Sequence, residues 1–448
     1  MSKASIKQTV RIVLGATARP VGTLTYNKEG AREFSAFAYD AAWLSAPDRF
    51  DISPDLGLVE GHQFRKAPSK EDSMFHFALA DTEPDGWGCR VIARDHAKNR
   101  RAALAAGQKA PRAALTEMDY LLGVDDMSRI GALRLVDEAG HFLRTIEPGG
   151  RGTPPLIELA QLIDATRAVE MNRETEADLR YLRGRGTSLG GMRPKCTILD
   201  EDGHLAIGKF PSVKDDRSVT RGEILALHLA SAAGMTVASA RIVMSDDIPV
   251  ALVRRFDRTV DGSRIPYLSA GSMLQALRAD DHAYTEIADA IRIHSVEPAR
   301  DLEELWRRMA FNLLITNVDD HLHNHGFLHV EHGQWRLAPT FDINPFPDKD
   351  PELKLWLTPE SGPVDSILEV VEQAGYFDLS DDDALRVLAE VCAAVQDWKR
   401  IAKSEPVGMT EHDLDAFAPA LENEQMDLAM QLLGKRGVSL PRVSATRG

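Results

Sequence analysis

Hydrophobic and polar residues alternate along the first sixty positions, and turn residues separate the alternating stretches. The alternation is clearest at residues 8–14 and 21–26, and a period of two predicts short strands of a sheet. Residues 90–122 are instead rich in Ala, Arg and Lys, which indicates helix, with Pro111 beginning a second piece. A further strand is predicted at residues 130–136.

A stretch rich in Gly, Pro and Thr at residues 148–155 is the best candidate for a linker. Beyond it we expect a helix at 156–169 and a hairpin of two strands, 195–199 and 205–210. A helix at 221–233 and strands at 238–244 and 250–256 follow. From Ser269 onward the hydrophobic spacing is helical, with helices expected at residues 301–316, 381–403 and 422–433.

A strand-rich part followed by a helical part, with a cluster of Asp, Asn and His residues at positions 317–342 near their junction, is the layout of an α+β, bilobal protein-kinase-like fold. We therefore expect an N-terminal subdomain at residues 1–150, a strand-rich N-lobe at 151–260 and a mostly helical C-lobe at 261–448. At 448 residues the chain is too long for one small core, which agrees with several packed units.

Composition narrows the function classes. The formal net charge of −15 disfavours a broad nucleic-acid surface on this chain. Three widely spaced cysteines argue against a disulfide framework or zinc site and suit a reducing cytosol. The N-terminus lacks the hydrophobic core of a signal peptide, and the run at 224–240 is too interrupted to span a membrane. We expect a soluble cytoplasmic protein without membrane contact.

The polar residues between positions 317 and 342 have the spacing of a phosphoryl-transfer site. Asp319 is the candidate base for the attacking hydroxyl, while Asn324 and Asp342 are candidate Mg²⁺ ligands. Taken alone, these residues are also typical of turns and helix caps. The constellation gains weight from a glycine-rich segment and a strand lysine upstream, and together they predict a kinase that uses ATP.

Three further patterns bear on that prediction. His321, His323 and His325 alternate as zinc ligands on a strand could, but no fourth ligand is evident, and we reject a histidine metal site. The glycines before Lys195 would let backbone N–H groups approach phosphates, although glycine pairs are common in plain turns. Residues 252–258 could offer backbone groups to adenine, or form an ordinary buried strand.

Lys209 stands alone in a hydrophobic strand at Ile207–Pro211. Such a lysine is usually a solvated edge residue, but in a kinase it contacts the nucleotide phosphates and a helix carboxylate. Glu223, early in the next helix, is the natural partner, although a glutamate there also suits the helix dipole.

With these residues in place, the chain resembles the HipA family of bacterial serine/threonine kinases, the toxins of toxin–antitoxin pairs. The resemblance covers nearly the whole chain and rests on the segments 21–24, 75–88, 131–133, 190–195, 256–258, 317–324 and 341–342.

The resemblance implies a role for each matching residue. Asp319 would accept the proton, Asn324 and Asp342 would bind Mg²⁺, and Ser188 would be the autophosphorylated serine. A phosphate on Ser188 would add roughly two negative charges beside the ATP loop and silence the kinase. ATP itself would be bound by Gly190, Gly191, Met192, Arg193, Pro194, Lys195, Lys209, Arg254, Arg255, Phe256, His321, Asn324 and Asp342.

The family also implies partners: a protein substrate, with aminoacyl-tRNA synthetases as the expected class, and a HipB-like helix-turn-helix antitoxin that makes most of the DNA contacts. Two alternatives stay open. A small-molecule kinase of the aminoglycoside or sugar type shares the Asp-x4-Asn pattern but lacks the N-terminal subdomain of about 150 residues. A nucleotide-binding co-repressor without catalysis would retain the same residues.

Overall fold

The alternating segments at the start of the chain form a five-stranded antiparallel sheet. The computed structural model describes residues 5–143, 158–183 and 191–442, and the sheet has the order β4-β3-β2-β1-β5. Inward-facing residues such as Ile12, Leu24 and Phe37 are fully buried. The strands predicted at the start of the chain are confirmed; the sheet consists of β1 Ser5–Leu14, β2 Arg19–Glu29, β3 Arg32–Tyr39, β4 Gln63–Arg65 and β5 Leu133–Val136.

Four described helices lie between β3 and β5 along the chain: α1 Ala41–Leu44, α2 Phe77–Ala80, α3 Gly86–Ala105 and α4 Glu117–Gly123. The expectation that a second helical piece begins at Pro111 is wrong. Thr116 caps α4 instead: its hydroxyl accepts the N–H of Asp119, while the Asp119 carboxylate accepts the N–H of Thr116 at 2.7 Å. This reciprocal capping fixes the start of the helix six residues later than the proline.

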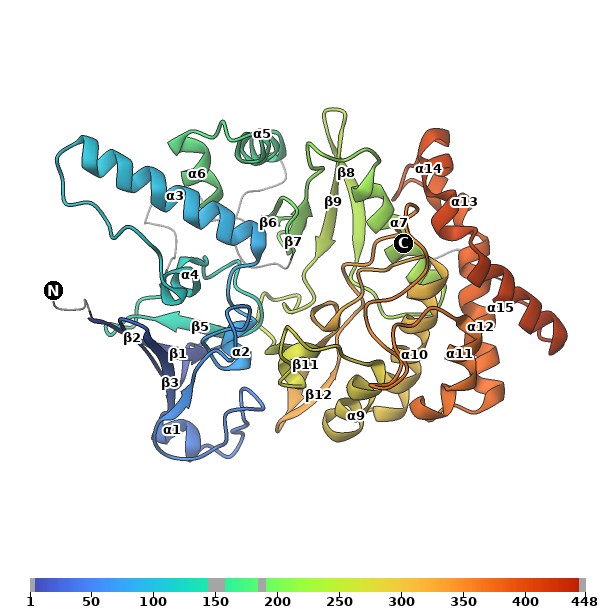
Figure 1. Cartoon of the computed structure of the whole chain (residues 1–448), viewed down its shortest axis with the longest axis horizontal. Coiled ribbons are helices and arrows are strands. Elements are labelled where there is room, and N and C mark those ends of the chain that lie inside the picture. Colours follow the sequence, from blue (N-terminus) through green and yellow to red (C-terminus); the bar gives the residue numbers. More distant parts are fainter. Residues whose placement is uncertain (1–4, 144–157, 184–190, 443–448) are drawn as a thin grey trace.

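A four-stranded sheet of order β6-β7-β9-β8 occupies the middle of the molecule in Figure 1, and the expected hairpin and strands are confirmed. Lys195 lies directly opposite Lys209 in the hairpin register, so their side chains share one face. Helix α7, Val219–Ala232, packs on β8 and β9. The strands are β6 Lys195–Leu199, β7 Leu205–Lys209, β8 Ala240–Ser245 and β9 Ile248–Arg254.

A second hydrophobic core joins the N-terminal helix α3 to this middle sheet. Trp87 and Val91 of α3 pack with Ile198 and Leu252 of the sheet and with buried residues of two helices. These helices are α5 Leu159–Glu170, close to the one expected at 156–169, and α6 Glu176–Arg183. The expected linker at 148–155 lies outside the described residues, and the domain boundaries stay predictions.

The last part of the chain is mainly helical, as expected, and forms the end of the molecule opposite the N-terminal sheet in Figure 1. The single helix expected at 381–403 is interrupted at Asp397, whose carbonyl accepts the N–H of Arg400 in a new first turn. The helices are α8 Ala270–Met273, α9 Tyr284–His294, α10 Pro298–Leu314, α11 Ile367–Glu372, α12 Asp381–Gln396, α13 Trp398–Lys403, α14 Glu411–Leu421 and α15 Glu424–Lys435, with 3-10 turns η2 Leu322–Asn324 and η3 Ala374–Phe377.

A small sheet inside this helical part was not expected. Strands β10 Tyr267–Ser269, β11 Gly326–Glu331 and β12 Gln334–Leu337 pair in that order. The β11–β12 hairpin turns through His332 and Gly333, both with positive φ, as a two-residue hairpin turn requires. The sheet matters because the candidate catalytic loop enters β11 and Asp342 follows β12.

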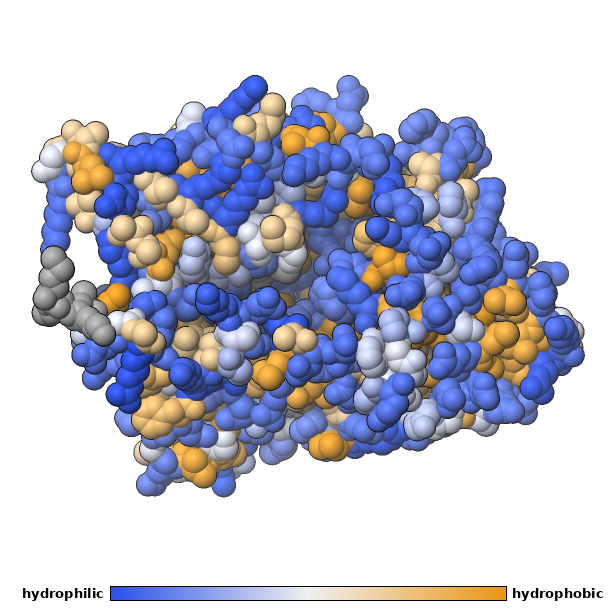
Figure 2. All heavy atoms as spheres, in the orientation of Figure 1, coloured by the Kyte–Doolittle hydropathy of each residue, from blue (hydrophilic) through white to orange (hydrophobic). Residues whose placement is uncertain are grey.

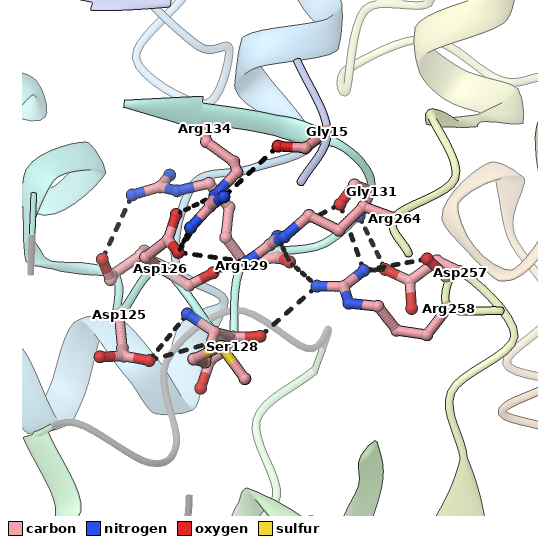
Figure 3. A network of polar contacts seen from close by, with 12 residues as sticks. Gly15, Asp125, Asp126, Ser128, Arg129, Gly131, Arg134, Asp257, Arg258 and Arg264 are labelled. Atoms are coloured by element: carbon pink, nitrogen blue, oxygen red, sulfur yellow. Dashed lines mark hydrogen bonds and ion pairs between the residues drawn. The ribbon is translucent and has the colours of Figure 1, made fainter. Parts of the chain in front are cut away.

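Buried charged residues tie the N-terminal part to the segment that follows β9 (Figure 3). The Asp257 carboxylate accepts hydrogen bonds from Arg255 at 2.6 Å, from Arg258 at 2.7 Å and from the N–H of Gly131 at 2.7 Å. Arg255 also donates to the carbonyl of Ser128 at 2.8 Å. The segment leaving the middle sheet is therefore fixed against the loop before β5.

Within the described part of the chain, no helix has both the length and the hydrophobicity to cross a membrane.

Candidate active site

Lys209 lies at the centre of a charge cluster drawn from three distant segments. Its Nζ atom, at the end of β7, is 2.5 Å from Oε1 of Glu223 on α7 and 2.6 Å from Oδ1 of Asp342 after β12. All three side chains are less than one-third exposed. The structure thus brings together the strand lysine, its expected helix partner and one expected metal ligand.

The charges in this cluster stabilise one another. Burial opposes ionisation of Asp342, but Lys209 and Lys195 outweigh it and lower the pKa of this carboxyl to about 2. Burial also disfavours the charged form of Lys209, yet Asp342 and Glu223 together raise its pKa. Burial raises the pKa of Glu223 against the attraction of Lys209. Both shifts favour the charged form of Lys209 and of Asp342 near pH 7.

Lys195 is held by an acid from the N-terminal part. Its Nζ atom is 3.4 Å from Oδ2 of Asp85, and both side chains are buried. Asp85 also caps α3, because its Oδ1 accepts the N–H of Gly88 at 2.6 Å. The carbonyl of Gly191 accepts the N–H of Trp87 at 3.3 Å. Sequence reasoning gave Asp85 no role in the site.

The other described residues of the glycine-rich segment differ in exposure and in their contacts. Gly191 has φ of +86°, which suits only glycine, and Met192 is 73% exposed. Arg193 pairs with Asp215, and the Pro194 carbonyl accepts the N–H of Phe210 at 3.0 Å. Ser188 and Gly190 lie outside the described residues.

The loop after α10 presents Asp319 at the surface. The Asp319 side chain is 53% exposed and forms an ion pair with Lys354, a residue that sequence reasoning missed. The amide nitrogen of Asn324 donates to the Asp319 carbonyl at 3.0 Å, across the 3-10 turn η2. The expected base and metal ligand therefore belong to one hydrogen-bonded loop.

A buried asparagine links this loop to the segment of Asp342. Oδ1 of Asn317 accepts the N–H of Asn344 at 3.1 Å, and its amide nitrogen donates to Oδ1 of Asn312 at 3.1 Å. Asp342 itself has φ of +54°, an uncommon conformation that Asp tolerates better than most residues. The backbone on both sides of the site is thus joined through one side chain.

Asp320, the neighbour of Asp319, points the opposite way, into the core. It is 1% exposed, accepts from Nε2 of His325 at 3.0 Å and accepts the hydroxyl proton of Tyr284. Burial opposes its ionisation, but His325 outweighs this and lowers the pKa of Asp320. The buried network fixes the loop that presents Asp319.

The three alternating histidines have different surroundings. His325 is hydrogen-bonded to Asp320. His323 lies against Gly271, and its ring centroid is 6.0 Å from that of His321. Burial lowers the pKa of His323 to about 4, so it is neutral near pH 7. His321 is close enough to Asp342 to lower the pKa of that carboxyl further.

In the expected adenine-binding segment, residues 254–256, several polar groups are already used in hydrogen bonds within the protein. The N–H groups of Arg254 and Arg255 already donate to the carbonyls of Ser239 at 2.8 Å and Leu205 at 3.0 Å. The Arg255 guanidinium is committed to Asp257. Phe256 differs, because its ring lies 5.3 Å from the ring of Phe341, next to Asp342.

The oxygen atoms of Asp342 and Asn324 suit Mg²⁺ that is also bound by phosphates better than they suit a metal ion bound by protein side chains alone. Among the described residues, no group of three or more His, Cys, Asp or Glu side chains is arranged to hold a metal ion. Magnesium needs only one or two protein oxygens when phosphates supply the rest. The ionised carboxylate of Asp342 would be one such ligand. Asn324 would offer the other through Oδ1, because its amide nitrogen already donates to the Asp319 carbonyl.

The face of the molecule drawn in Figure 2 is hollowed near its middle, and mostly hydrophilic residues line the hollow. A lysine on a sheet strand, its glutamate partner on the next helix and an acid after a later hairpin are the parts of a kinase-like site. Together with the strand-rich and helical parts on either side, they define the class as a kinase-like α+β fold.

Comparisons with known proteins agree with this class. Residues 187–399 match the family model described as HipA-like C-terminal domain. It is 24% identical over 417 residues to the Sinorhizobium fredii protein Putative kinase Y4mE, covering 87% of this chain and 84% of that protein.

Among solved structures, HipA of Shewanella oneidensis MR-1, determined with HipB and operator DNA, matches with a TM-score of 0.67. The match has 15% identity and covers 95% of this chain and 97% of that chain, so it shows a shared fold over nearly the whole length. The Helicobacter pylori kinase CtkA matches over 55% of this chain with a TM-score of 0.43 and 17% identity.

Proposed function

We propose that this protein is a Mg²⁺- and ATP-dependent serine/threonine protein kinase of the HipA type. The observation that carries the proposal is the position of Lys209, bonded at once to Glu223 and Asp342. A lysine paired with a helix glutamate beside a metal-binding acid is the arrangement that kinases need for phosphoryl transfer.

The proposal gives each side chain of the cluster a task. Lys209 binds the nucleotide phosphates, and Glu223 keeps its ammonium in place. Lys195, on the same face of the hairpin, adds positive charge near the phosphates. Phe256 and Phe341 offer aromatic surface for the adenine.

Asn324 and Asp342 would hold Mg²⁺, which neutralises charge on the phosphate oxygens when bound. Asp342 suits this role because its carboxylate stays ionised over the physiological pH range. When phosphates arrive, Lys209 can exchange its bond to Asp342 for bonds to phosphate oxygens while it retains Glu223.

Asp319 acts on the acceptor. The acceptor hydroxyl oxygen attacks the γ-phosphorus as the bond from that phosphorus to the β–γ bridging oxygen breaks. ADP leaves with the electron pair, and the hydroxyl proton passes to the Asp319 carboxylate. The exposed position of Asp319 suits an acceptor that comes from solvent.

The finer parts of the proposal rest on the family. The acceptor would be a Ser or Thr of a cellular protein, with an aminoacyl-tRNA synthetase as the expected class, and Ser188 would be phosphorylated in the same chain. A HipB-like antitoxin would neutralise the kinase and carry most of the DNA contact; the relative from Shewanella, solved with HipB and operator DNA, supports this. Free cysteines and use of ATP fit the cytoplasm.

Incubation of the purified protein with γ-labelled ATP and Mg²⁺, followed by mass spectrometry, tests the proposal. We expect phosphate on Ser188, none after Asp319→Asn, and wild-type labelling after Asp350→Asn, a matched change at an exposed acid. Labelling of Asp319→Asn at the wild-type rate would remove Asp319 from catalysis. Transfer to small hydroxylated molecules but to no protein would favour the small-molecule kinase.

A further inference from the structure

The segment that carries Lys354 has a strict alternation. Leu353, Leu355 and Leu357 are each no more than 3% exposed, whereas the Lys354 side chain is 57% exposed. Such a period of two belongs to an extended chain with one face in the core. The three leucines therefore anchor the segment and direct Lys354 to the opposite face, where it meets Asp319.

Backbone hydrogen bonds hold this segment on both sides. The N–H of Trp356 donates to the His282 carbonyl at 2.9 Å, and the Trp356 carbonyl accepts the N–H of Tyr284 at 2.9 Å. On the other side, the N–H of Leu353 donates to the carbonyl of Val364 at 2.8 Å. The position of Lys354 is thus determined by backbone hydrogen bonds on each flank.

Tyr284 also connects this segment to the catalytic loop. Its backbone pairs with Trp356, and its hydroxyl donates to the buried Asp320, next in the chain to Asp319. One residue therefore aligns the segment of Lys354 with the loop of Asp319. An ion pair between two exposed side chains contributes only about 0–1 kcal/mol to stability, so stability alone gives little reason for such alignment.

We propose that Lys354 is a further catalytic residue, whose ammonium contacts the γ-phosphoryl group during its transfer to the acceptor oxygen. The inference rests on the proposed function. A proton acceptor must lie within hydrogen-bond reach of the attacking oxygen, and a cation that touches this acceptor lies beside the phosphorus under attack. Transferring phosphoryl groups carry charge on three equatorial oxygens, which a nearby cation stabilises.

The ammonium keeps all its protons in this step. Before the nucleotide binds, Lys354 neutralises Asp319; as the γ-phosphate arrives, the ammonium moves to the phosphate oxygens. Asp319 is then free to accept the hydroxyl proton while the new oxygen–phosphorus bond forms and ADP leaves.

Three variants test this role: Lys354→Met, Lys354→Arg and the matched control Lys349→Met, an exposed lysine of the same segment. For Lys354→Met we expect a loss of about 10²-fold in kcat, the size seen when one transition-state donor is removed, with KM for ATP within about threefold of wild type. Lys354→Arg keeps part of the rate because the charge remains. Lys349→Met matches wild type. A kcat of Lys354→Met equal to or higher than that of wild type overturns the inference. A higher value would mean that the ion pair with Lys354 inhibits Asp319.

Calorimetric binding of Mg²⁺·ADP with and without tetrafluoroaluminate separates the two proposals, because it needs no protein acceptor. Wild type should bind the fluoride complex more tightly than ADP, and Lys354→Met should lose about tenfold or more of that preference while binding ADP normally. If the variant keeps the full preference, Lys354 has no such role. If wild type binds no nucleotide, the proposed function fails first, and the role of Lys354 fails with it.

Discussion

The ammonium of Lys195 lies 3.4 Å from the carboxylate of Asp85, with 4% and 6% of the two side chains exposed. Lys195 begins the hairpin of the middle sheet, whereas Asp85 caps a helix of the N-terminal part. Burial lowers the pKa of Lys195 and raises that of Asp85, each against the attraction of the other. Through this ion pair, the N-terminal part of the chain fixes the position of Lys195 at the end of the glycine-rich segment.

Asp85→Asn should loosen the glycine segment. Lys195 would lose its buried partner, and breaking one half of such a pair costs about 3 kcal/mol of folding stability. We expect KM for ATP to rise about tenfold, with a smaller change in kcat, because the proposed function gives this segment a role in nucleotide binding rather than in proton transfer. Steady-state kinetics and thermal unfolding measure both effects.

Glu71→Gln, at an exposed acid of the N-terminal part, serves as the control and should match wild type in both measurements. A stability loss in Asp85→Asn with unchanged KM would mean that the pair only stabilises the fold.

The local sequence pattern was sufficient to predict the strands of the middle sheet and to single out Lys209. The hairpin strands alternate over a turn of Asp and Gly, and a lone lysine in the second strand, before a helix with an early glutamate, could be recognised from neighbouring residues. The same holds for Asp319 and Asn324, which the sequence spacing already places in one loop.

The missed residues depend on contacts between distant segments. Asp85 reads as a helix cap, and only the packing of α3 on the middle sheet brings it to Lys195. Lys354 reads as a charged residue among leucines, and nothing local shows that its partner is Asp319. The start of α4 differs from the prediction for a local reason, because the Thr116–Asp119 capping box rather than Pro111 sets where the helix begins.

Lys209 and Glu223 should contribute unequally to catalysis. Lys209→Met removes the cation to which the proposed function assigns phosphate binding, and we expect kcat/KM to fall by about 10²-fold or more. Glu223→Gln leaves the lysine in place but less well held, so a loss of about tenfold is expected. Kinetics with γ-labelled ATP measure both, and Lys214→Met, at an exposed lysine, should be neutral. A larger loss in Glu223→Gln than in Lys209→Met would contradict this order.

Glu83 should make the fold less stable as pH rises. Burial raises the pKa of this carboxyl to about 8 from an ordinary value of 4.5. Between these values the unfolded chain releases the proton and the folded chain retains it, so stability present below pH 4.5 is lost as pH rises toward 8. The limiting slope is about 1.4 kcal/mol per pH unit.

Glu83→Gln removes the titrating group. The variant should unfold at a higher temperature than wild type at pH 8 and at a similar temperature at pH 5, as measured by thermal unfolding at both values. Glu138→Gln, at an exposed position, should keep the wild-type dependence. An equal difference between Glu83→Gln and wild type at both pH values would show that Glu83 does not titrate in this window.

Asp257→Asn should be strongly destabilising. Figure 3 shows Asp257 beside Arg258 and Gly131. The carboxylate accepts from Arg255, Arg258 and the N–H of Gly131, so the change leaves two buried guanidinium groups without their acid. We expect the free energy of unfolding at pH 7 to fall by about 3 kcal/mol. Urea unfolding measures this directly, and Asp261→Asn, at an exposed acid nearby, should shift the midpoint little.

The pH dependence distinguishes the ion network from simple packing. Burial opposes ionisation of Asp257, but Arg255 and Arg258 outweigh it and hold the pKa of this carboxyl well below its usual range. Its stabilising contribution is therefore present above about pH 4, the unfolded pKa of an aspartate, and is lost as pH falls further. The difference between wild type and Asp257→Asn should stay constant from pH 7 to about 5 and shrink only below about 4. A difference independent of pH down to 3 would mean that shape rather than charge holds this segment in place.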